Sequence, residues 1–374
     1  MNVRPFLWPA LLIALAAAVY LRVGREMPDF GVYRTAATRA LRAEPLYRAE
    51  DGHYQFKYLP AFALAMAPFA LLDPDAAKTI WFALSVGLLT AYLRWSVRAL
   101  PERRRPDRVL LLLTVVLMAK FYLHELTLGQ TNILLGTLLV AALLAVQIDH
   151  PLVAAGLIGA AAFVKPYALV LMPWLAFSYG AATISVALAV LGVGLALPAL
   201  VYGWSGNLQL LVGWYQTVTS STGPNLLGAD NISLAAMWAK WLGPGTAAGA
   251  LATASSVGLL GVVAAVWLKR TSVSIPDYLE FALLMLAIPL LSPQGWDYVL
   301  LLATPAVVCL MDRWPEVTGG WRLFTGAALA LMGLTIFDVM GRELYGRFMA
   351  RSIVSVAALA AVAALAHLRW RALA

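Results

Sequence analysis

One carboxylate, Asp29, stands where the chain leaves its first apolar segment and enters the polar interval 27–58. A charge at a helix end is commonly solvated and balanced by neighbouring arginines, here Arg25 or Arg34. A carboxylate at the lip of a membrane cavity can instead accept a proton from a hydroxyl group, and partial burial adjusts its basicity for that task. Residue type and position leave both interpretations of Asp29 open.

The end of the same interval carries Lys57 and Tyr58, with His53 a few residues earlier. Lys57 fits either a cation that reaches from a span end to the membrane interface or a contact to an anionic headgroup. Tyr58 is a candidate substrate contact beside it. His53 lies in a polar loop and is interpreted as a surface residue.

Amides and a second lysine stand next to later apolar runs. Gln130 and Asn132 can cap the helix that follows them or hydrogen-bond to sugar hydroxyls and phosphate oxygens. Lys165 stands alone between apolar segments, which is costly unless it lies at an interface or contacts an anion. Asn231 and Ser233 match a glycosylation sequon, but we favour a helix start or a polar group of the site.

The sequence Ser-Pro-Gln-Gly-Trp-Asp, residues 292–297, separates two apolar runs. It fits a tight turn with an interfacial tryptophan, and its Gln294, Trp296 and Asp297 side chains also fit the lining of a cavity. The sequence lacks a phosphate loop, a dinucleotide-binding glycine motif, a zinc-binding HExxH and a GxSxG nucleophile motif. Cys309 is the only cysteine, so neither a disulfide nor a thiolate metal cluster is expected.

The composition predicts the kind of fold that holds these residues in place. The chain has 374 residues, of which 62% are hydrophobic and 12% charged, and its mean hydropathy is +0.79. Such a chain is an integral membrane protein, and apolar runs near the ~20 residues of a transmembrane helix favour helices over a barrel. We expect an all-α, polytopic bundle of about 11–13 transmembrane helices that forms a single domain over residues 1–374. The net charge of +8 comes from Arg and Lys at segment ends, so the expected partners include membrane lipids and no nucleic acid.

The expected spans lie near residues 5–21, 58–72, 79–97, 109–123, 132–147, 151–164, 167–177, 183–202, 247–268, 278–291, 298–311, 323–339 and 353–368. The first is expected to be an uncleaved anchor and not a signal peptide. Residues 30–42 are expected to form an amphipathic helix in the extracytoplasmic interface, and the polar interval 203–229 a large extracytoplasmic loop.

Charge sets the expected topology. The basic run 99–108 should be cytoplasmic by the positive-inside rule. Counting back from the basic pairs 269–270 and 312–313 places the motifs at Gln130, Lys165, Asn231 and Gln294 outside, with Asp29. The segment 58–72 would then enter and leave on one side as a re-entrant or broken helix, or else the run 99–108 is an exception to the rule.

Six pieces of the chain, in order between residue 29 and about residue 302, resemble glycosyltransferase family 87. They are DFGVYRTAATRALRAEPLY, FKYLPAFALAMAPFALL, GQTNILLGTLL, AAFVKPYALVLMPWL, NISLAAMW and SPQGWDYVLLL. The resemblance implies a GT-C class fold and an inverting enzyme of the plasma (inner) membrane whose active site faces the extracytoplasmic side. It also implies a polyprenyl-phosphate sugar as donor and a carboxylate base, here Asp29. Lys165, with Lys57 and Gln130, would stabilise the charge on the leaving phosphate.

One position departs from the family pattern. Members commonly carry a histidine shortly after the tryptophan of the Ser-Pro…Trp motif, whereas this chain has Asp297 and Tyr298 there. No DxD pair flanked by a polar loop is present, so neither a metal nor a cofactor is expected.

The expected reaction is transfer of mannose, or else another hexose or a pentose, to an extracytoplasmic lipid or glycan acceptor. The alternative from another class is a transporter or flippase of lipid-linked sugars. Transporters often carry paired repeats, and no second copy of the Asp29 region is present, which favours the enzyme. A membrane scaffold is a third interpretation, and in that case Asp29 would be dispensable.

Overall fold

The computed structural model describes residues 20–21, 26–273 and 276–371. In these ranges every element is a helix, and the one extended contact is an isolated bridge between Asn231 and Trp296. The expected all-α class is therefore confirmed. The expected span 5–21, and with it the uncleaved anchor, lies outside the described residues except for Tyr20 and Leu21.

The elements up to residue 164 are α2 (Pro28–Leu41), the 3-10 helix η1 (Ala49–Tyr54), α3 (Pro60–Ala65), α4 (Ala67–Ala70), α5 (Pro74–Arg98), α6 (Asp107–Leu128), α7 (Asn132–Gln147) and α8 (Pro151–Val164). The middle of the chain forms η2 (Pro166–Val170), α9 (Leu171–Tyr179), α10 (Ala182–Ala196), α11 (Ala199–Asn225), α12 (Leu234–Leu242), α13 (Thr246–Leu268) and η3 (Arg270–Ser272). The last elements are α14 (Asp277–Leu291), η4 (Asp297–Ala303), α15 (Thr304–Asp312), η5 (Trp314–Glu316), α16 (Gly320–Gly333), α17 (Phe337–Met340), α18 (Arg342–Ala350) and α19 (Ile353–Arg371).

Four described helices, α5, α6, α13 and α19, are long and apolar enough to cross a membrane, with 25, 22, 23 and 19 residues. The pair α10 and α11, bent by 95°, makes a fifth if it is one broken span, and α7 and α8 are shorter apolar helices. The protein is thus a polytopic membrane bundle. Several of the expected apolar segments are short or broken helices, because Pro and Gly interrupt them.

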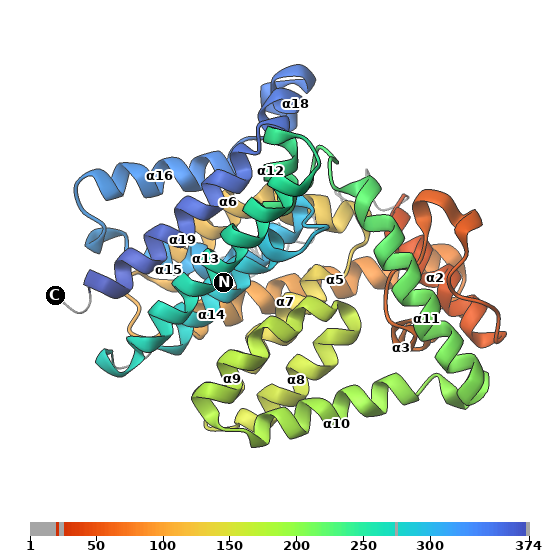
Figure 1. Cartoon of the computed structure of the whole chain (residues 1–374). Coiled ribbons are helices and arrows are strands. Elements are labelled where there is room, and N and C mark those ends of the chain that lie inside the picture. Colours follow the sequence, from red (N-terminus) through yellow and green to blue (C-terminus); the bar gives the residue numbers. More distant parts are fainter. Residues whose placement is uncertain (1–19, 22–25, 274–275, 372–374) are drawn as a thin grey trace, which may run out of the picture.

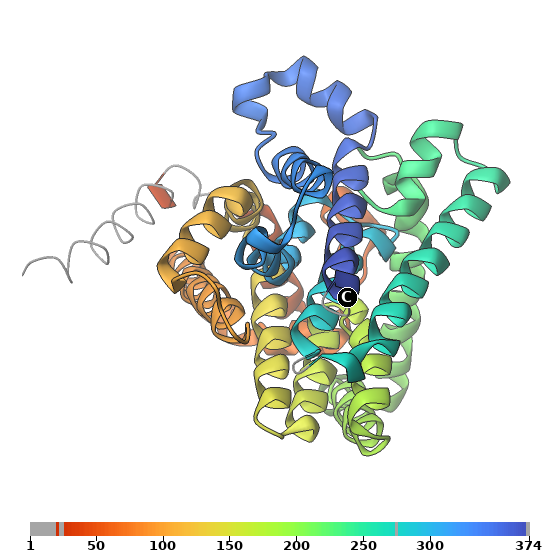
Figure 2. The same ribbon diagram turned by 90° about the vertical axis from the view of Figure 1, so that its left-hand side faces the viewer.

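Basic segments far apart in sequence meet at one end of the bundle. Asp312 Oδ1 accepts hydrogen bonds from the backbone N–H groups of Arg104 and Arg105 at 2.8 and 2.9 Å. Arg104 also pairs with Glu316, whose carbonyl accepts from Arg371 at 2.6 Å. Figure 1 shows α15, α16 and the C-terminus at this end, with α2, α3 and α11 at the other. The C-terminus of α19 faces the viewer in Figure 2.

The segment 58–72 does not form a single helix long enough to span a membrane. It forms α3 and α4, of six and four residues, which at about 1.5 Å per residue are far shorter than the ~30 Å hydrocarbon core. Arg34 of α2 holds the end of the segment by donating to the carbonyls of Phe69 and Leu72 at 3.3 and 3.0 Å. The basic run 99–108 consequently lies at the end opposite to α2, as expected if 58–72 is a re-entrant or broken helix.

The amphipathic helix expected at residues 30–42 is present as α2. Its buried face comprises Phe30, Tyr33, Ala36, Ala37 and Ala40, while Leu41 is exposed. The polar interval 203–229 is not the expected loop, because most of it belongs to α11. The helix there breaks only at Gly203, which has φ 66°, so its polar side chains lie on helix faces.

Candidate active site

The candidate base Asp29 belongs to a hydrogen-bonded chain that joins α2 to the loop between α6 and α7. Gln130 Nε2 donates to Asp29 Oδ2 at 2.7 Å, and Gln130 Oε1 accepts from the Tyr58 hydroxyl at 3.1 Å. The Tyr58 hydroxyl also lies 2.7 Å from that of Tyr33. Asp29 and Gln130 are 101 positions apart in the sequence, yet they share one polar network.

Gly129 allows Gln130 to reach Asp29. It ends α6 in the left-handed region at φ 68°, and a Cβ atom there would lie 2.9 Å from Phe30 Cβ and 3.1 Å from Met27 Cβ. The Gly129 carbonyl accepts from Trp81 Nε1 at 2.9 Å, which fixes the turn. A residue with a side chain would be strained at this φ and would push α6 away from α2.

The Asp29 carboxyl is more basic than an exposed aspartate. Burial raises its pKa, while the hydrogen bond from Gln130 and the charge of Lys165 oppose that rise. The Asp29 side chain is partly exposed, and α2 is not one of the long apolar helices. A carboxylate with a raised pKa is a better proton acceptor than an ordinary one, which suits a general base.

Lys165 faces the same network. It follows the last residue of α8, and its Nζ lies 5.9 Å from the ring centroids of both Tyr58 and Tyr167. Burial lowers the pKa of Lys165 to about 8, and the charges of Glu125 and Asp29 oppose that shift. Asp29 and Lys165 therefore lie on one side of the protein, as a shared site requires.

Lys57 is a second cation near Asp29. Burial lowers the pKa of Lys57, and Asp29 opposes the shift. Its carbonyl accepts from Trp214 Nε1 of α11 at 3.1 Å, so α11 holds this part of the loop. His53, expected on the surface, is exposed, although its charge acts on Asp29.

Both ends of the Asn132 side-chain amide hydrogen-bond to other side chains of the protein. Its Nδ2 donates to Glu125 Oε2 at 2.8 Å, and its Oδ1 accepts from the Tyr167 hydroxyl at 2.9 Å. Glu125 also accepts from the backbone N–H of Ile133 at 3.1 Å, and both Asn132 and Glu125 are fully buried. Asn132 thus positions the start of α7 and the ring of Tyr167 beside Lys165. Glu125 was not selected from the sequence, and its signal there is a charged residue just after the expected span 109–123.

Asn231 holds the two later motifs together. Its Nδ2 donates to the carbonyls of Pro293 and Asn225 at 2.9 and 3.1 Å, and its Oδ1 accepts from the backbone N–H of Ser233 at 3.1 Å. The expected helix start is Ser233, whose hydroxyl accepts from Ala236 N at 3.0 Å. Asn231 is fully buried, so its contacts are with the chain.

The turn at 292–297 packs against the same segment. Gln294 Nε2 donates to the hydroxyls of Ser221 and Thr222 on α11, each at 3.1 Å. Trp296 pairs with Asn231 in the isolated bridge, and the edge of its ring lies 3.1 Å from where a Cβ of Gly228 would stand. These contacts hold the turn 292–297 against α11 and the segment that precedes α12.

Asp297 and Tyr298 meet a histidine that sequence reasoning did not select. His124 Nδ1 lies 3.4 Å from Asp297 Oδ1, and the His124 ring stands edge-on to the Tyr298 ring at 5.1 Å between centroids. The side chain of His124 is 37% exposed, whereas that of Asp297 is 6% exposed. In the sequence, the feature that could have identified His124 is the pair of polar residues 124 and 125 near the end of an apolar segment. His124 is also within electrostatic reach of Asp29.

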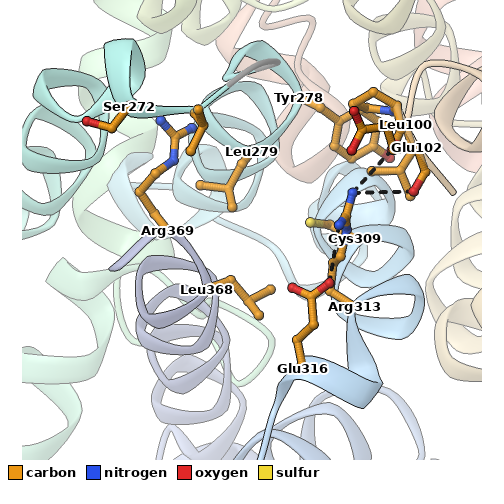
Figure 3. Close-up of a pocket in the computed structure, with 12 residues that line it drawn as sticks. Leu100, Glu102, Ser272, Tyr278, Leu279, Cys309, Arg313, Glu316, Leu368 and Arg369 are labelled. Carbon is orange, nitrogen blue, oxygen red and sulfur yellow. Dashed lines mark hydrogen bonds and ion pairs between the residues drawn. The ribbon is translucent and has the colours of Figure 1, made fainter. Parts of the chain in front are cut away.

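A separate cavity of about 340 Å³ lies at the opposite, basic end (Figure 3). Arg313 pairs there with Glu316 at 3.2 Å, as Figure 3 shows. The buried Arg369 pairs at 3.4 Å with Glu280, which does not line the cavity. The cavity shares no lining residue with the Asp29 network. Within the described ranges, no three His, Cys, Asp or Glu side chains gather as metal ligands.

The fold and the site together define a multi-pass membrane protein in which a half-buried carboxylate faces two lysines at one end of a helical bundle. Residues 56–293 match the family model of glycosyltransferase family 87, and the chain belongs to that family. It is accordingly a glycosyltransferase. No curated protein and no solved structure matches the chain.

The matched range covers Lys57, Tyr58, Gln130, Lys165 and Asn231, but it begins after Asp29 and ends before Gln294. The case for Asp29 therefore depends on its hydrogen bond to a residue inside the matched range.

Proposed function

We propose that this protein is an inverting glycosyltransferase that moves a sugar, with mannose favoured, from a polyprenyl-phosphate donor to an extracytoplasmic lipid or glycan acceptor. The observation that carries the proposal is the Asp29 carboxylate, held by Gln130 at 2.7 Å and within electrostatic reach of Lys165, whose ammonium lies 5.9 Å from the Tyr58 ring centroid. The protein would work in the plasma (inner) membrane, with Asp29 on the extracytoplasmic side.

Asp29 would act as the general base. Gln130 holds Oδ2, and Oδ1 accepts no hydrogen bond from the residues that the structure describes. The acceptor hydroxyl would give its proton to Oδ1 while its oxygen forms a bond to the anomeric carbon. The bond from that carbon to the phosphate oxygen breaks on the opposite face, and its electron pair leaves with polyprenyl phosphate. One displacement inverts the anomeric configuration.

The lysines would stabilise the leaving group. An anionic phosphate beside Lys165 favours the charged ammonium, so the cation persists although burial lowers the pKa of the free group to about 8. Lys57 would add a second positive charge at the mouth of the same site. Fixed cations aimed at developing negative charge, in a site that is partly closed to water, are effective in catalysis.

The test is sugar transfer by the purified full chain in lipid nanodiscs. Radiolabelled polyprenyl-phosphate mannose is supplied with extracted membrane lipids as acceptors, and wild type is compared with Asp29→Asn. We expect the variant to lose about 10²- to 10⁴-fold in rate, the usual contribution of a general base. The matched control is Asp75→Asn, an exposed carboxylate in the first turn of α5, which should keep wild-type rates.

Transfer by Asp29→Asn at the wild-type rate would remove Asp29 as the base. Absence of transfer by wild type with any polyprenyl-phosphate sugar, together with translocation of the labelled lipid across vesicles, would favour the flippase alternative.

A further inference from the structure

A groove of about 360 Å³ runs along one face of α2 and is closed on its other side by η1 and the residues after it. From α2 it takes Pro28, Gly31, Val32, Thr35 and Arg39, which recur one helical turn apart. From Pro28 to Arg39 the helix rises about 16 Å. Pro28 directly precedes Asp29 in α2, so the groove ends one residue from the candidate base, although Asp29 itself does not line it.

The far end of the groove carries a charged pair of zero net charge. Arg39 Nη2 donates to Asp51 Oδ1 at 2.7 Å, and Arg39 Nη1 donates to the other carboxylate oxygen. The two side chains are 14% and 21% exposed, and both line the groove. The hydrogen bonds from Arg39 hold the pKa of Asp51 below its usual range, so this carboxylate stays ionised.

Such a pair offers both kinds of hydrogen bond to a ligand. A guanidinium has five N–H donors and a carboxylate about four lone-pair positions, and the bidentate contact uses only part of each. Neighbouring hydroxyls on a sugar ring donate and accept at once. An anion would instead be repelled by Asp51, so the pair favours a neutral polyol over a phosphate.

The wall between the two ends is apolar and aromatic. Tyr54 is 55% exposed, and Phe56 and Val32 lie beside it along the groove. Aromatic rings with one apolar face and one polar edge suit ligands that have both kinds of surface. Pockets lined largely by apolar groups with a few placed polar ones are typical of small-molecule sites.

Gly31 leaves the groove open. A Cβ atom at this position would have no other atom within 4 Å, and its φ does not require glycine. A larger side chain at Gly31 would therefore project into free space and would not disturb the packing of α2. Since most residues have a higher helix propensity than glycine, the substitution should also keep the helix.

We propose that this groove is the binding site for the sugar portion of the acceptor, with the Arg39–Asp51 pair and Tyr54 holding a neutral ring. The hydroxyl to be glycosylated would lie at the Pro28 end, next to Asp29. This inference rests on the proposed transfer reaction and assigns the acceptor side of it.

The first experiment separates acceptor from donor. Steady-state transfer is measured for wild type, Gly31→Leu and Gly346→Leu, a matched control because a Cβ atom added at Gly346 of α18 would also have no other atom within 4 Å. We expect Gly31→Leu to raise KM for the acceptor at least tenfold and to leave KM for the donor unchanged, and the control to match wild type. Asp51→Asn, which keeps the shape of the side chain, should raise KM for the acceptor similarly.

An unchanged acceptor KM in Gly31→Leu, with transfer intact in wild type, would overturn the groove and leave the proposed function standing. A second readout does not need transfer. Binding of a neutral mannose disaccharide and of inorganic phosphate is measured by saturation-transfer NMR on the full chain without donor.

We expect the disaccharide to bind wild type, to bind Gly31→Leu at least tenfold more weakly, and to bind in preference to phosphate. Equal disaccharide binding to wild type and Gly31→Leu, or none to either, would overturn the inference even if no transfer were seen.

Discussion

Replacement of Gln130 by methionine tests whether Asp29 is the titrating base. Methionine has a similar length but no N–H donor, so Asp29 Oδ2 would lose the hydrogen bond that it accepts at 2.7 Å. A hydrogen bond to a charged group contributes about 1.5–3 kcal/mol, and one pKa unit corresponds to about 1.36 kcal/mol. The pKa of Asp29, already raised by burial, should therefore rise by about one to two further units.

The sign of the effect on activity follows from the role of the base. Only ionised Asp29 can take the acceptor proton, so kcat/KM falls as pH drops through the pKa of the carboxyl. In Gln130→Met the acid limb of the profile should move to higher pH by about one to two units. Above the shifted limb, the rate should recover much of its wild-type value.

The assay is the pH profile of kcat/KM for the acceptor, measured for wild type, Gln130→Met and Gln147→Met. Gln147 is the matched control, because its Nε2 donates at 2.7 Å to the Ala99 carbonyl at the opposite end of the bundle. In Gln130→Met the backbone N–H of Thr131 also loses its acceptor, Gln130 Oε1, which should lower the melting temperature of the variant. That loss does not shift the midpoint of the pH profile. An acid limb with the same midpoint in Gln130→Met and wild type would refute the assignment of Asp29 as the base that Gln130 tunes.

Two further variants address the cation and the turn. Wild-type kcat/KM should also fall above a midpoint near pH 8, where Lys165 of the free enzyme loses its proton. In Lys165→Arg this basic limb should move beyond the measurable range, because a guanidinium stays charged. A basic limb that stays near pH 8 in the variant would show that another group causes it. Gly129→Ala should destabilise the fold by about 1–3 kcal/mol in denaturant melts and reduce transfer, because its Cβ would lie 2.9 Å from Phe30 Cβ at φ 68°. Gly258→Ala, with free space at its Cβ, is the control, and a Gly129→Ala protein with wild-type stability and activity would show that the close approach of α6 to α2 is not needed.

The assignment of Asn132 illustrates where residue type alone is ambiguous. An asparagine ahead of an apolar run suits both a helix start and a ligand contact, and only the buried partner Glu125 decides how its amide is used. The same holds for Asp297, whose partner His124 lies on α6 and not in the turn that carries Asp297. Partners of this kind come from elements distant in sequence, so local spacing cannot identify them.

The sequence by itself determined that this protein lies in a membrane and that its elements are helices, although it did not predict that most of 203–229 is helical. A chain with 62% hydrophobic residues has too few polar residues to cover its surface in water. The periodic apolar face of residues 30–42 predicts α2, because helix geometry depends on neighbouring residues only. The clustering of arginines at segment ends also predicted which segments share an end of the bundle, and residues 99–108 and 312–316 do so.

Only the tertiary structure decided which polar groups meet. It showed that the segment 58–72 is broken into α3 and α4 and stays beside α2, which places Asp29, Gln130 and Lys165 at one end. It also opened the groove beside Gly31, where the Arg39–Asp51 pair forms across a helix and a loop. The physical reason is that hydrogen bonds, ion pairs and cavities depend on distances between segments, and packing of the whole bundle sets those distances.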